Sequence, residues 1–463
     1  MITPPPSLWW SQLDDTTPRA PLHGDIDVDV AIIGGGYTGL WTARELLRRD
    51  AHLRVCVLEA RVCGFGASGR NGGWASALFP APASAIVARF GRDAFARQRR
   101  VLQDAVVSLG EAALDEGIDC DYVRGGTVTF ARSRAQVARA RRHLDEAVGL
   151  GIEAADVRWL APEELRGVGT VEGALGATYS PHCARVHPAR LVRGLAQAVE
   201  RRGASIYENT RVSQVRAGSA ARRALVLTPH ATVRAHYVVR ATEGFTPTMP
   251  GQRRTVVPLY SLMIATAPLP HAWWRDYGFD GFPTFSDERH LLIYGQRTSD
   301  NRLAFGGRGS PYHFGSTVEP RYDTNENVFT HLASSLRQLF PTLDAEITHR
   351  WGGPLAMSRD TLPAVRVDHA TGLATAGGYT GDGVTLSYVC ANALADLIVS
   401  PQTPTPYSTL PFVQTPLRRW EFEPGRWLGI NAGIALATYA DHFERHHDGE
   451  SRASSWLSRL MGA

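Results

Sequence analysis

Three glycines at fixed spacing, Gly34, Gly36 and Gly39, constrain the fold of this chain more than any other feature. They follow a short apolar run typical of a strand and open a helical apolar stripe, so they fit the pattern G-x-G-x-x-G. The first glycine allows a tight turn, the second lets the main chain approach a diphosphate, and the third lets helix pack on strand. Free N–H groups at the start of the helix favour negative charge. Residues 29–59 are therefore predicted to form a strand–helix–strand unit that binds a dinucleotide.

An acidic residue, Glu59, ends the second apolar run of this unit. A carboxylate there accepts hydrogen bonds from a ribose diol and repels a 2′-phosphate. The pattern by itself does not distinguish NAD from FAD. The loop that follows, residues 64–73 with the sequence GFGASGRNGG, is too rich in glycine for a core segment. Such a loop suits close approach of the main chain to a flat or charged group.

Together, GGGYTGL at residues 34–40, the LEA around Glu59 and the loop GFGASGRNGG resemble the D-amino-acid-oxidase-type flavoproteins, which include glycine and sarcosine oxidases. Within that family the chain is most similar to the gamma-glutamylputrescine oxidoreductases, from about residue 25 to about residue 398. The resemblance implies an α/β fold, with a Rossmann-like FAD-binding domain of the glutathione-reductase type and an inserted α+β substrate domain built on a large mixed sheet. It implies an FAD-binding domain of residues 25–84, 176–250 and 350–400, a substrate domain of residues 85–175 and 251–349, and a C-terminal linker and helical tail of residues 401–463.

A second glycine-rich turn favours FAD over NAD. Residues 373–397 are typical of a short strand, a turn and a helix whose N-terminus points back to the cofactor. In the family this G-Y-x-G-x-G-V element contacts the isoalloxazine ring. We expect the FAD to be non-covalent, because the loop GASGRNGG carries neither histidine nor cysteine. The residues expected to bind it are Gly34, Gly36, Tyr37, Thr38, Gly39, Glu59, Ala60, Arg61, Gly66, Ala67, Ser68, Arg70, Asn71, Gly72, Gly73, Val212, Ala241, Thr242, Gly378, Tyr379, Gly381, Asp382, Gly383 and Val384. Glu243 departs from the family pattern, in which Gly or Asn often follows the Ala-Thr pair.

Composition argues against several other classes of protein. The net charge is +4, and no basic cluster is interleaved with aromatic residues, so nucleic-acid binding is not expected. The five cysteines form no C-x-x-C pair and are odd in number, which argues against a disulfide scaffold and a metal site and favours the reducing cytoplasm. No stretch is long and apolar enough to predict a membrane span. With 463 residues, the chain is expected to form more than one domain.

The resemblance implies oxidation of a primary or secondary amine, with polyamines and gamma-glutamylated amines as candidate substrates. In the expected reaction, hydride passes from the carbon bearing nitrogen to the flavin, and water hydrolyses the imine to an aldehyde and ammonia or an amine. Alternatives are a D-amino-acid, glycine or sarcosine oxidase or dehydrogenase, an FAD hydroxylase using NADPH, and a non-catalytic FAD-binding subunit. The candidate catalytic residues are Tyr260, Tyr294, Trp351, Arg297 and His187. The aromatic residues suit cation–π attraction to an amine or simply a sheet core, and His187 is better explained as a structural residue at the start of a helix.

Three positions bear on the substrate and the electron acceptor. Relatives that oxidise α-amino acids grip the carboxylate with arginines, and approximate alignment places Gly353 and Gly381 at those positions. The expected amine therefore has a remote carboxylate or none, with Arg297 and Arg308 left as substitutes. In the sarcosine oxidase branch a lysine promotes reaction with oxygen, whereas all 49 basic residues here are arginine and Leu292 aligns with that lysine. The acceptor is O2 or another carrier, and we expect mainly the second, with His290 and Arg297 as the nearest cations.

The remaining pattern predicts helices and strands of ordinary length, and the oligomeric state stays open. The C-terminal helix is expected to dock on the body of the protein or on a second subunit rather than in a membrane. Expected helices are residues 85–119, 132–150, 189–202, 328–339 and 428–443, and expected strands are residues 122–131, 205–215 as two short strands, 238–242, 256–266, 291–294 and 302–305.

Overall fold

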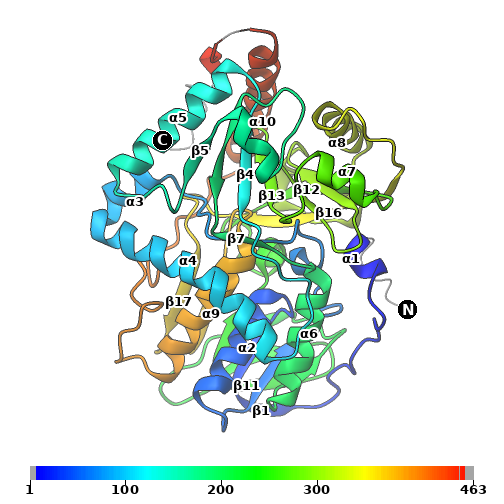
Figure 1. Cartoon of the computed structure of the whole chain (residues 1–463). Coiled ribbons are helices and arrows are strands. Elements are labelled where there is room, and N and C mark those ends of the chain that lie inside the picture. Colours follow the sequence, from blue (N-terminus) through cyan, green and yellow to red (C-terminus); the bar gives the residue numbers. More distant parts are fainter. Residues whose placement is uncertain (1–6, 448, 454–463) are drawn as a thin grey trace.

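The computed structural model describes residues 7–447 and 449–453. Its two large sheets lie one above the other, with the predicted strand–helix–strand unit in the lower one (Figure 1). Strand β1 (Ile26–Ile33) pairs in parallel with β2 (Val55–Leu58) and with β11 (Thr232–Arg240). Its second half is buried because it lies between two parallel neighbours, which explains the apolar run in the sequence. Helix α2 (Tyr37–Arg49) connects β1 to β2.

The lower sheet has eight strands and is mostly parallel. Its main path runs β17-β18-β11-β1-β2-β8, and β10 and β9 extend it along the first half of β11 as an antiparallel ribbon. The strands not yet bounded are β8 (Ser205–Tyr207), β9 (Gln214–Arg216), β10 (Ala224–Leu227), β17 (Ala364–Asp368) and β18 (Leu373–Gly377).

Four long helices share one hydrophobic cluster on one face of the lower sheet. Helix α2 packs beside α9, and Arg49 of α2 binds Asp396 of α9. A fifth, shorter helix joins the same cluster through Ile86. The bounds are α3 (Ala83–Phe90), α4 (Arg92–Asp115), α6 (Pro188–Arg201) and α9 (Gly383–Val399).

The upper sheet is mixed, because β13 and β4 run parallel while their other neighbours pair antiparallel. Its order is β16-β12-β15-β14-β13-β4-β6-β5. The bounds are β4 (Thr127–Ala131), β5 (Arg158–Leu160), β6 (Gly176–Ser180), β12 (Val257–Thr266), β13 (Thr284–Asp287), β14 (Ile293–Arg297), β15 (Leu303–Gly307) and β16 (Ile347–Met357). Between the sheets lies the two-stranded pair of β3 (Trp74–Ser76) and β7 (Cys183–Arg185).

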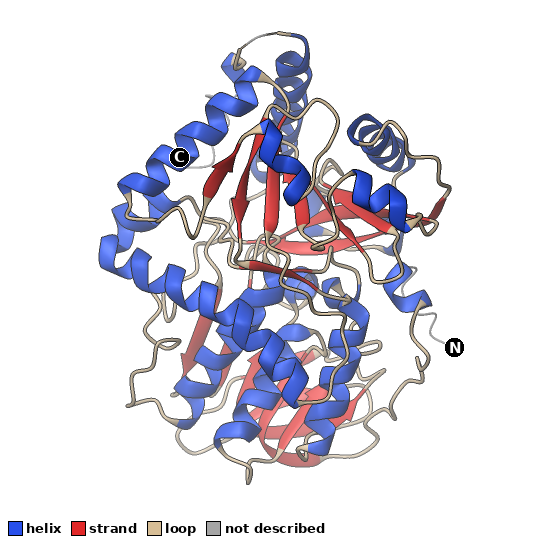
Figure 2. Ribbon diagram, in the orientation of Figure 1, coloured by secondary structure: helices blue, strands red, loops and turns tan. Residues whose placement is uncertain are grey.

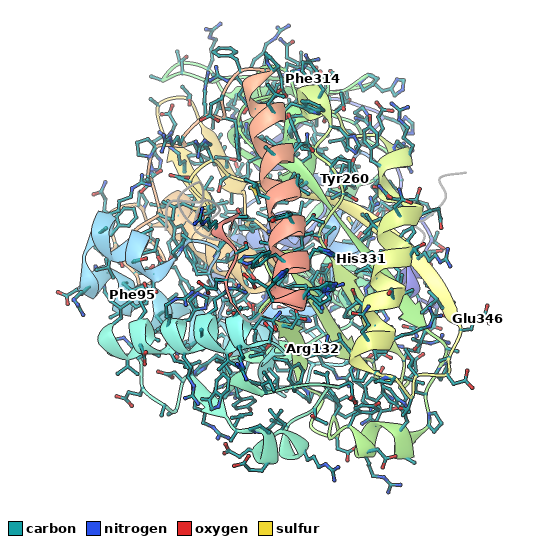
Figure 3. All side chains as sticks on the ribbon, turned by 90° about the horizontal axis from the view of Figure 1, so that it is seen from above. Phe95, Arg132, Tyr260, Phe314, His331 and Glu346 are labelled. Atoms are coloured by element: carbon teal, nitrogen blue, oxygen red, sulfur yellow. The ribbon has the colours of Figure 1, made fainter. Side chains whose placement is uncertain are left out.

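Helices surround the upper sheet (Figure 2). They are α5 (Arg134–Gly149), α7 (His271–Asp276), α8 (Glu326–Leu339) and α10 (Gly425–His446). Seen from above, α10 runs from the loop of Phe314 towards Arg132 (Figure 3). The tail helix is longer than expected, and it docks on the body of the protein: Asp441 accepts hydrogen bonds from the N–H groups of His290 and Leu291. One short helix, α1 (Leu8–Ser11), lies at the side between the two halves (Figure 1).

Sheet membership corrects three of the expected domain boundaries. Strand β6 was expected in the FAD-binding domain but pairs with β4 in the upper sheet. Strand β16 was expected there from residue 350 but pairs along its length with β12. Helix α4 was expected in the substrate domain, yet its apolar face joins the cluster of α2 and α9. The resemblance gave these boundaries only approximately, and a local pattern could not refine them, because it shows which face of an element is apolar but not which partner covers it.

Several element boundaries also differ from expectation. The helix expected over residues 85–119 is two helices, because Gly91 adopts φ 87° and breaks it. The strand expected over residues 122–131 is regular only in β4. Pro188 begins α6, where its missing N–H costs nothing, as expected. The described part of the chain contains no helix long and apolar enough to cross a membrane, and all five cysteines are buried free thiols.

The core of the upper half predicts a large effect on stability. Phe340 is fully buried and packs against the rings of Trp273, Phe279 and Phe285. Phe340→Ala should lower the free energy of unfolding by about 3–5 kcal/mol, because the ring leaves a cavity that rigid neighbours cannot fill. Chemical denaturation measures this loss. Phe422→Ala is the control, since Phe422 is 72% exposed, and a loss as small as in that control would contradict the predicted packing.

Candidate functional site

A cavity of about 440 Å³ lies where the carboxyl ends of β1, β2 and β11 face the upper sheet. Ligands of open α/β sheets bind at this edge. Most of the predicted cofactor residues line it: Gly34, Gly36, Tyr37, Thr38, Glu59, Ala60, Arg61, Gly66, Ala67, Ser68, Arg70, Asn71, Gly72, Val212, Ala241, Thr242, Tyr379, Gly381, Asp382, Gly383 and Val384. Three predicted residues, Gly39, Gly73 and Gly378, lie outside this lining.

The first glycine turn leaves no room for side chains. A Cβ on Gly34 would lie 2.4 Å from the carbonyl oxygen of Ala241, and one on Gly39 would lie 2.0 Å from that of Gly34. A Cβ on Gly36 would point at Ser68 Oγ, 2.9 Å away. Gly39 thus acts in helix–strand packing, whereas Gly36 keeps the start of α2 open to a ligand.

Glu59 is held in place by main-chain N–H groups. Its carboxylate accepts from Gly35 N and from Arg61 N, each at 2.8 Å. Burial raises the pKa of Glu59, although these two hydrogen bonds act in the opposite direction. A carboxylate has about four lone pairs, so two remain for a ribose diol.

The two glycine turns contact one another directly. Thr38, at the start of α2, shares a hydrogen bond of 2.9 Å with the hydroxyl of Tyr379. The hydroxyl of Tyr37 donates to Pro188 O. The hydroxyl groups of these three residues are thus engaged in hydrogen bonds within the protein. What the residues present to a cofactor is their main-chain groups and the surfaces of the two tyrosine rings.

Glu243 is a site residue that the sequence prediction left out. It lines the cavity, and its carboxylate accepts from Gly378 N at 2.7 Å and from Tyr379 N at 3.3 Å. Burial raises the pKa of Glu243 to about 7. The only signal in the sequence was its departure from the family pattern.

Of the five candidate catalytic residues, only Tyr294 lines the cavity. Its ring fits against two glycines, because a Cβ on Gly72 or Gly306 would lie 2.5–2.6 Å from ring atoms. Its hydroxyl shares a hydrogen bond of 2.9 Å with Ser261, another lining residue. Burial raises the pKa of Tyr294, so its hydroxyl stays protonated at neutral pH.

The other candidates point elsewhere. Arg297 is buried and binds Asn301, Asp280 and His271. Trp351 donates to Arg70 O, and Tyr260 accepts from Glu319 N. His187 caps α6 by accepting from Arg190 N, and burial lowers its pKa to about 4. All four lie outside the cavity lining, so the structure does not support catalytic roles for them, while the structural interpretation of His187 agrees with its place at the start of α6.

Arg308 brings positive charge to Gly381, one of the two positions where relatives that oxidise α-amino acids carry arginines. A Cβ on Gly381 would lie 2.6 Å from Arg308 Nη2, so this guanidinium fills the space above the second turn. Arg308 Nη2 donates to Thr380 O at 2.7 Å, and Arg308 lines the cavity. At the other position, a Cβ on Gly353 would lie 3.5 Å from the guanidinium of Arg70. Arg70, however, is already bound to Phe65 O, Gly352 O and Asp323.

The cavity fits FAD on its own geometry. It joins an open helix start, an acidic residue at the end of β2, a glycine-rich loop and a second helix start, α9, in one continuous space. The first two suit a diphosphate and a ribose, and the last two suit a flat ring that gains negative charge. Among the described residues, no group of His, Cys, Asp and Glu is placed to hold a metal ion.

The carboxyl of Asp382 predicts a pH-dependent stability. Burial raises its pKa to about 6, from 3.8 in an unfolded chain, although Arg308 lowers it. Between these pH values the folded state binds a proton that the unfolded state does not, so stability falls as pH rises from about 4 to about 6. The variant Asp382→Asn lacks this pH dependence. The difference in free energy of unfolding, variant minus unaltered protein, should therefore rise by up to about 3 kcal/mol between pH 4 and pH 6 and then level off.

Denaturant titration of the FAD-free protein at a series of pH values measures the difference. Asp344→Asn removes an exposed carboxylate outside the cavity and is the matched control. A constant difference between Asp382→Asn and the unaltered protein across pH 4–7 would show that Asp382 titrates alike in both states.

The comparisons with known proteins agree with this geometry. A family model described as FAD dependent oxidoreductase matches residues 29–397. The probable oxidoreductase OrdL of Rhizobium meliloti is 29% identical over 86% of this chain and 90% of its own length. The gamma-glutamylputrescine oxidoreductase of Escherichia coli is 28% identical over 82% of this chain and 86% of its own.

A solved structure, the glycine oxidase of Geobacillus kaustophilus, has a TM-score of 0.70 and 25% identity, and the match covers 85% of this chain and 99% of that one. Both the family match and the architecture extend over most of the chain. Because the residues of the family model include both glycine turns and the cavity between them, the chain belongs to the FAD-dependent oxidoreductase family and is an enzyme whose cofactor is FAD.

Proposed function

We propose that this enzyme oxidises the C–N bond of a primary or secondary amine that carries an anionic group away from the reacting carbon. The observation that carries the proposal is Arg308, whose guanidinium lies above Gly381 at the cavity wall. Relatives named for gamma-glutamylputrescine and for glycine support an amine or amino acid as the substrate class. FAD, when bound, supplies the two-electron acceptor for hydride from the carbon bearing nitrogen.

The residues of the chain bind and orient the amine. Arg308 keeps donors free after its bond to Thr380 O, and a guanidinium binds a carboxylate through two parallel hydrogen bonds. Tyr294 presents an aromatic face and a neutral hydroxyl, while Leu292 and Leu355 add apolar surface to the same cavity. Asp382 is ionised above pH 6 and attracts the amine nitrogen.

A second candidate function is oxidation of an α-amino acid, as in glycine oxidase. Arg308 favours it too, because its guanidinium occupies the place where an arginine at residue 381 would grip an α-carboxylate. Gly353 argues against it, since the neighbouring Arg70 uses its donors on protein oxygens. We further propose a reducing compartment, the cytoplasm, which suits five buried free thiols.

FAD is expected to be bound without a covalent bond. Cys63 approaches the loop, but it is fully buried beneath the first turn, where a Cβ on Gly35 would lie 2.6 Å from its Sγ. Denaturation with acid should release all yellow colour into the supernatant, and flavin left in the precipitate would contradict the prediction. Gly36→Leu should purify without FAD, because its side chain fills the place of the diphosphate.

Arg308→Met tests the anionic group. Loss of two charge-assisted hydrogen bonds should lower kcat/KM for carboxylate-bearing amines by about 2–3 kcal/mol, roughly 30- to 150-fold, and leave amines without a carboxylate unchanged. Steady-state kinetics with polyamines, acylated polyamines, secondary amines and D-amino acids measures both. Arg350→Met, at an exposed site that binds Glu326, is the control. Higher efficiency with simple D-amino acids than with every amine would establish the second candidate instead.

The enzyme is expected to pass electrons mainly to an acceptor other than oxygen. Leu292 lines the cavity, whereas His290 binds Arg139 and Glu444, and Arg297 lies outside the lining. A compact ammonium is thus absent from that wall, and arginine spreads its charge over a plane. Stopped-flow mixing of reduced enzyme with oxygenated buffer should show reoxidation slower than turnover with an artificial acceptor.

Leu292→Lys supplies the ammonium and should speed reoxidation by oxygen at least tenfold, whereas Leu292→Met is a matched uncharged control that should not. An unaltered enzyme that reoxidises as fast as it turns over would be an oxidase, and the lack of lysine would then carry no functional meaning.

A further inference from the structure

The N-terminal arm, residues 7–13, contacts the loop of residues 64–73. Ser7 Oγ donates to Gly69 O at 3.2 Å, and Trp9 Nε1 donates to Asn71 O at 2.9 Å. Between them, Trp351 Nε1 donates to Arg70 O at 2.8 Å. Three successive carbonyls of the loop therefore accept hydrogen bonds from outside the loop, two of them from the arm.

The loop depends on such contacts for its shape. Its glycines give it many unfolded conformations, and its own hydrogen bonds are short-range, such as Gly69 N to Gly66 O and Arg70 N to Ala67 O. The arm also fits the loop closely, because a Cβ on Gly69 would lie 2.4 Å from Trp10 Nε1. The arm thus restricts a segment whose sequence alone does not restrict it.

The same loop lines the cofactor cavity, through Gly66, Ala67, Ser68, Arg70, Asn71 and Gly72. From the upper sheet, Gln296 Nε2 donates to Gly72 O at 2.6 Å. The loop that the arm contacts is therefore also a wall of the place for FAD.

The arm is firmly docked on both halves of the molecule. Leu8, Trp9 and Trp10 are 1–3% exposed, in a cluster that joins Val62 of the lower half to Met263 of the upper. The rings of Trp9 and Trp351 meet edge to face at 6.2 Å, and Trp9 meets His187 in the same way at 5.2 Å. His187 Nε2 and Gln12 Oε1 are 3.2 Å apart. His187, which lies outside the cavity lining, thus contacts two residues of the arm.

We propose that Ser7 and Trp9 are positioning residues of the FAD site, and that the docked arm holds the loop in the conformation that binds FAD. The inference holds whichever amine the enzyme oxidises. By linkage, an arm that favours FAD binding must itself be stabilised by FAD to the same extent.

Trp9→Phe tests whether the arm favours FAD binding. It keeps an aromatic ring in the cluster and removes the donor to Asn71 O. Titration of the FAD-free variant should show a dissociation constant for FAD about three- to tenfold above that of the unaltered protein, the effect of one hydrogen bond. Trp351→Phe should also weaken FAD binding, because it removes the donor to Arg70 O, the carbonyl between those of Gly69 and Asn71. Trp273→Phe removes a donor to Thr342 at a site outside the cavity and is the matched control with no expected change.

Amide hydrogen exchange of the unaltered protein tests, without any substitution, whether FAD stabilises the arm in return. The N–H groups of Trp10, Ser11 and Leu13 are hydrogen-bonded within the arm, and their exchange should slow severalfold when FAD is added. The proposal is overturned if FAD protects the loop and leaves arm exchange unchanged. It is also overturned if Trp9→Phe and Trp351→Phe bind FAD as tightly as Trp273→Phe does.

Discussion

The packing of α2 against α9 is the constraint on which the cofactor site depends. The two helices run in the same direction and are joined at three levels. Thr38 bonds Tyr379 at their starts, Trp41 meets Tyr388 edge to face at 5.0 Å, and Arg49 binds Asp396 near their ends. Because both N-termini open on one cavity, two sets of free N–H groups and two helix dipoles favour negative charge in it. The distance between the glycine turns is therefore set in part by side chains outside the cavity lining, namely Trp41, Tyr388, Arg49 and Asp396.

The upper sheet supplies the opposite wall, and glycine is again what permits the approach. Tyr294 can take its place in the cavity lining only because Gly72 in the loop and Gly306 in β15 carry no Cβ. Its hydroxyl is fixed through Ser261, which also bonds Gly307 O. A residue of the cavity lining is thus positioned by both halves of the molecule, which makes the relative placement of the two sheets a condition for the shape of the cavity.

Most residues expected to bind the cofactor line the cavity, whereas of the five expected catalytic residues only Tyr294 does. Gly34, Gly36 and Glu59 follow one another within one strand–helix–strand unit, so local geometry is enough to bring them together. Arg308 and Arg297 are both cations near strand ends of the same sheet, and no local pattern tells which one faces the cavity. The register of β14 and β15 decides it, and register depends on tertiary packing. The same reason explains α4, since a helix was predicted within residues 85–119 but the cluster that covers its apolar face was not.

Charge around the second turn shows why buried carboxyls are tolerated beside a site built for anions. Glu243 and Asp382 lie at opposite ends of the turn, and burial raises the pKa of each, to about 7 and about 6. A carboxylate whose pKa is already raised binds a proton when negative charge accumulates nearby, so it then no longer repels that charge. Glu243 accepts from two main-chain N–H groups, and these would otherwise be buried without partners. An apolar residue at that position would remove the repulsion but would leave the turn before α9 without its support, and the turn is what places Gly381 beneath Arg308.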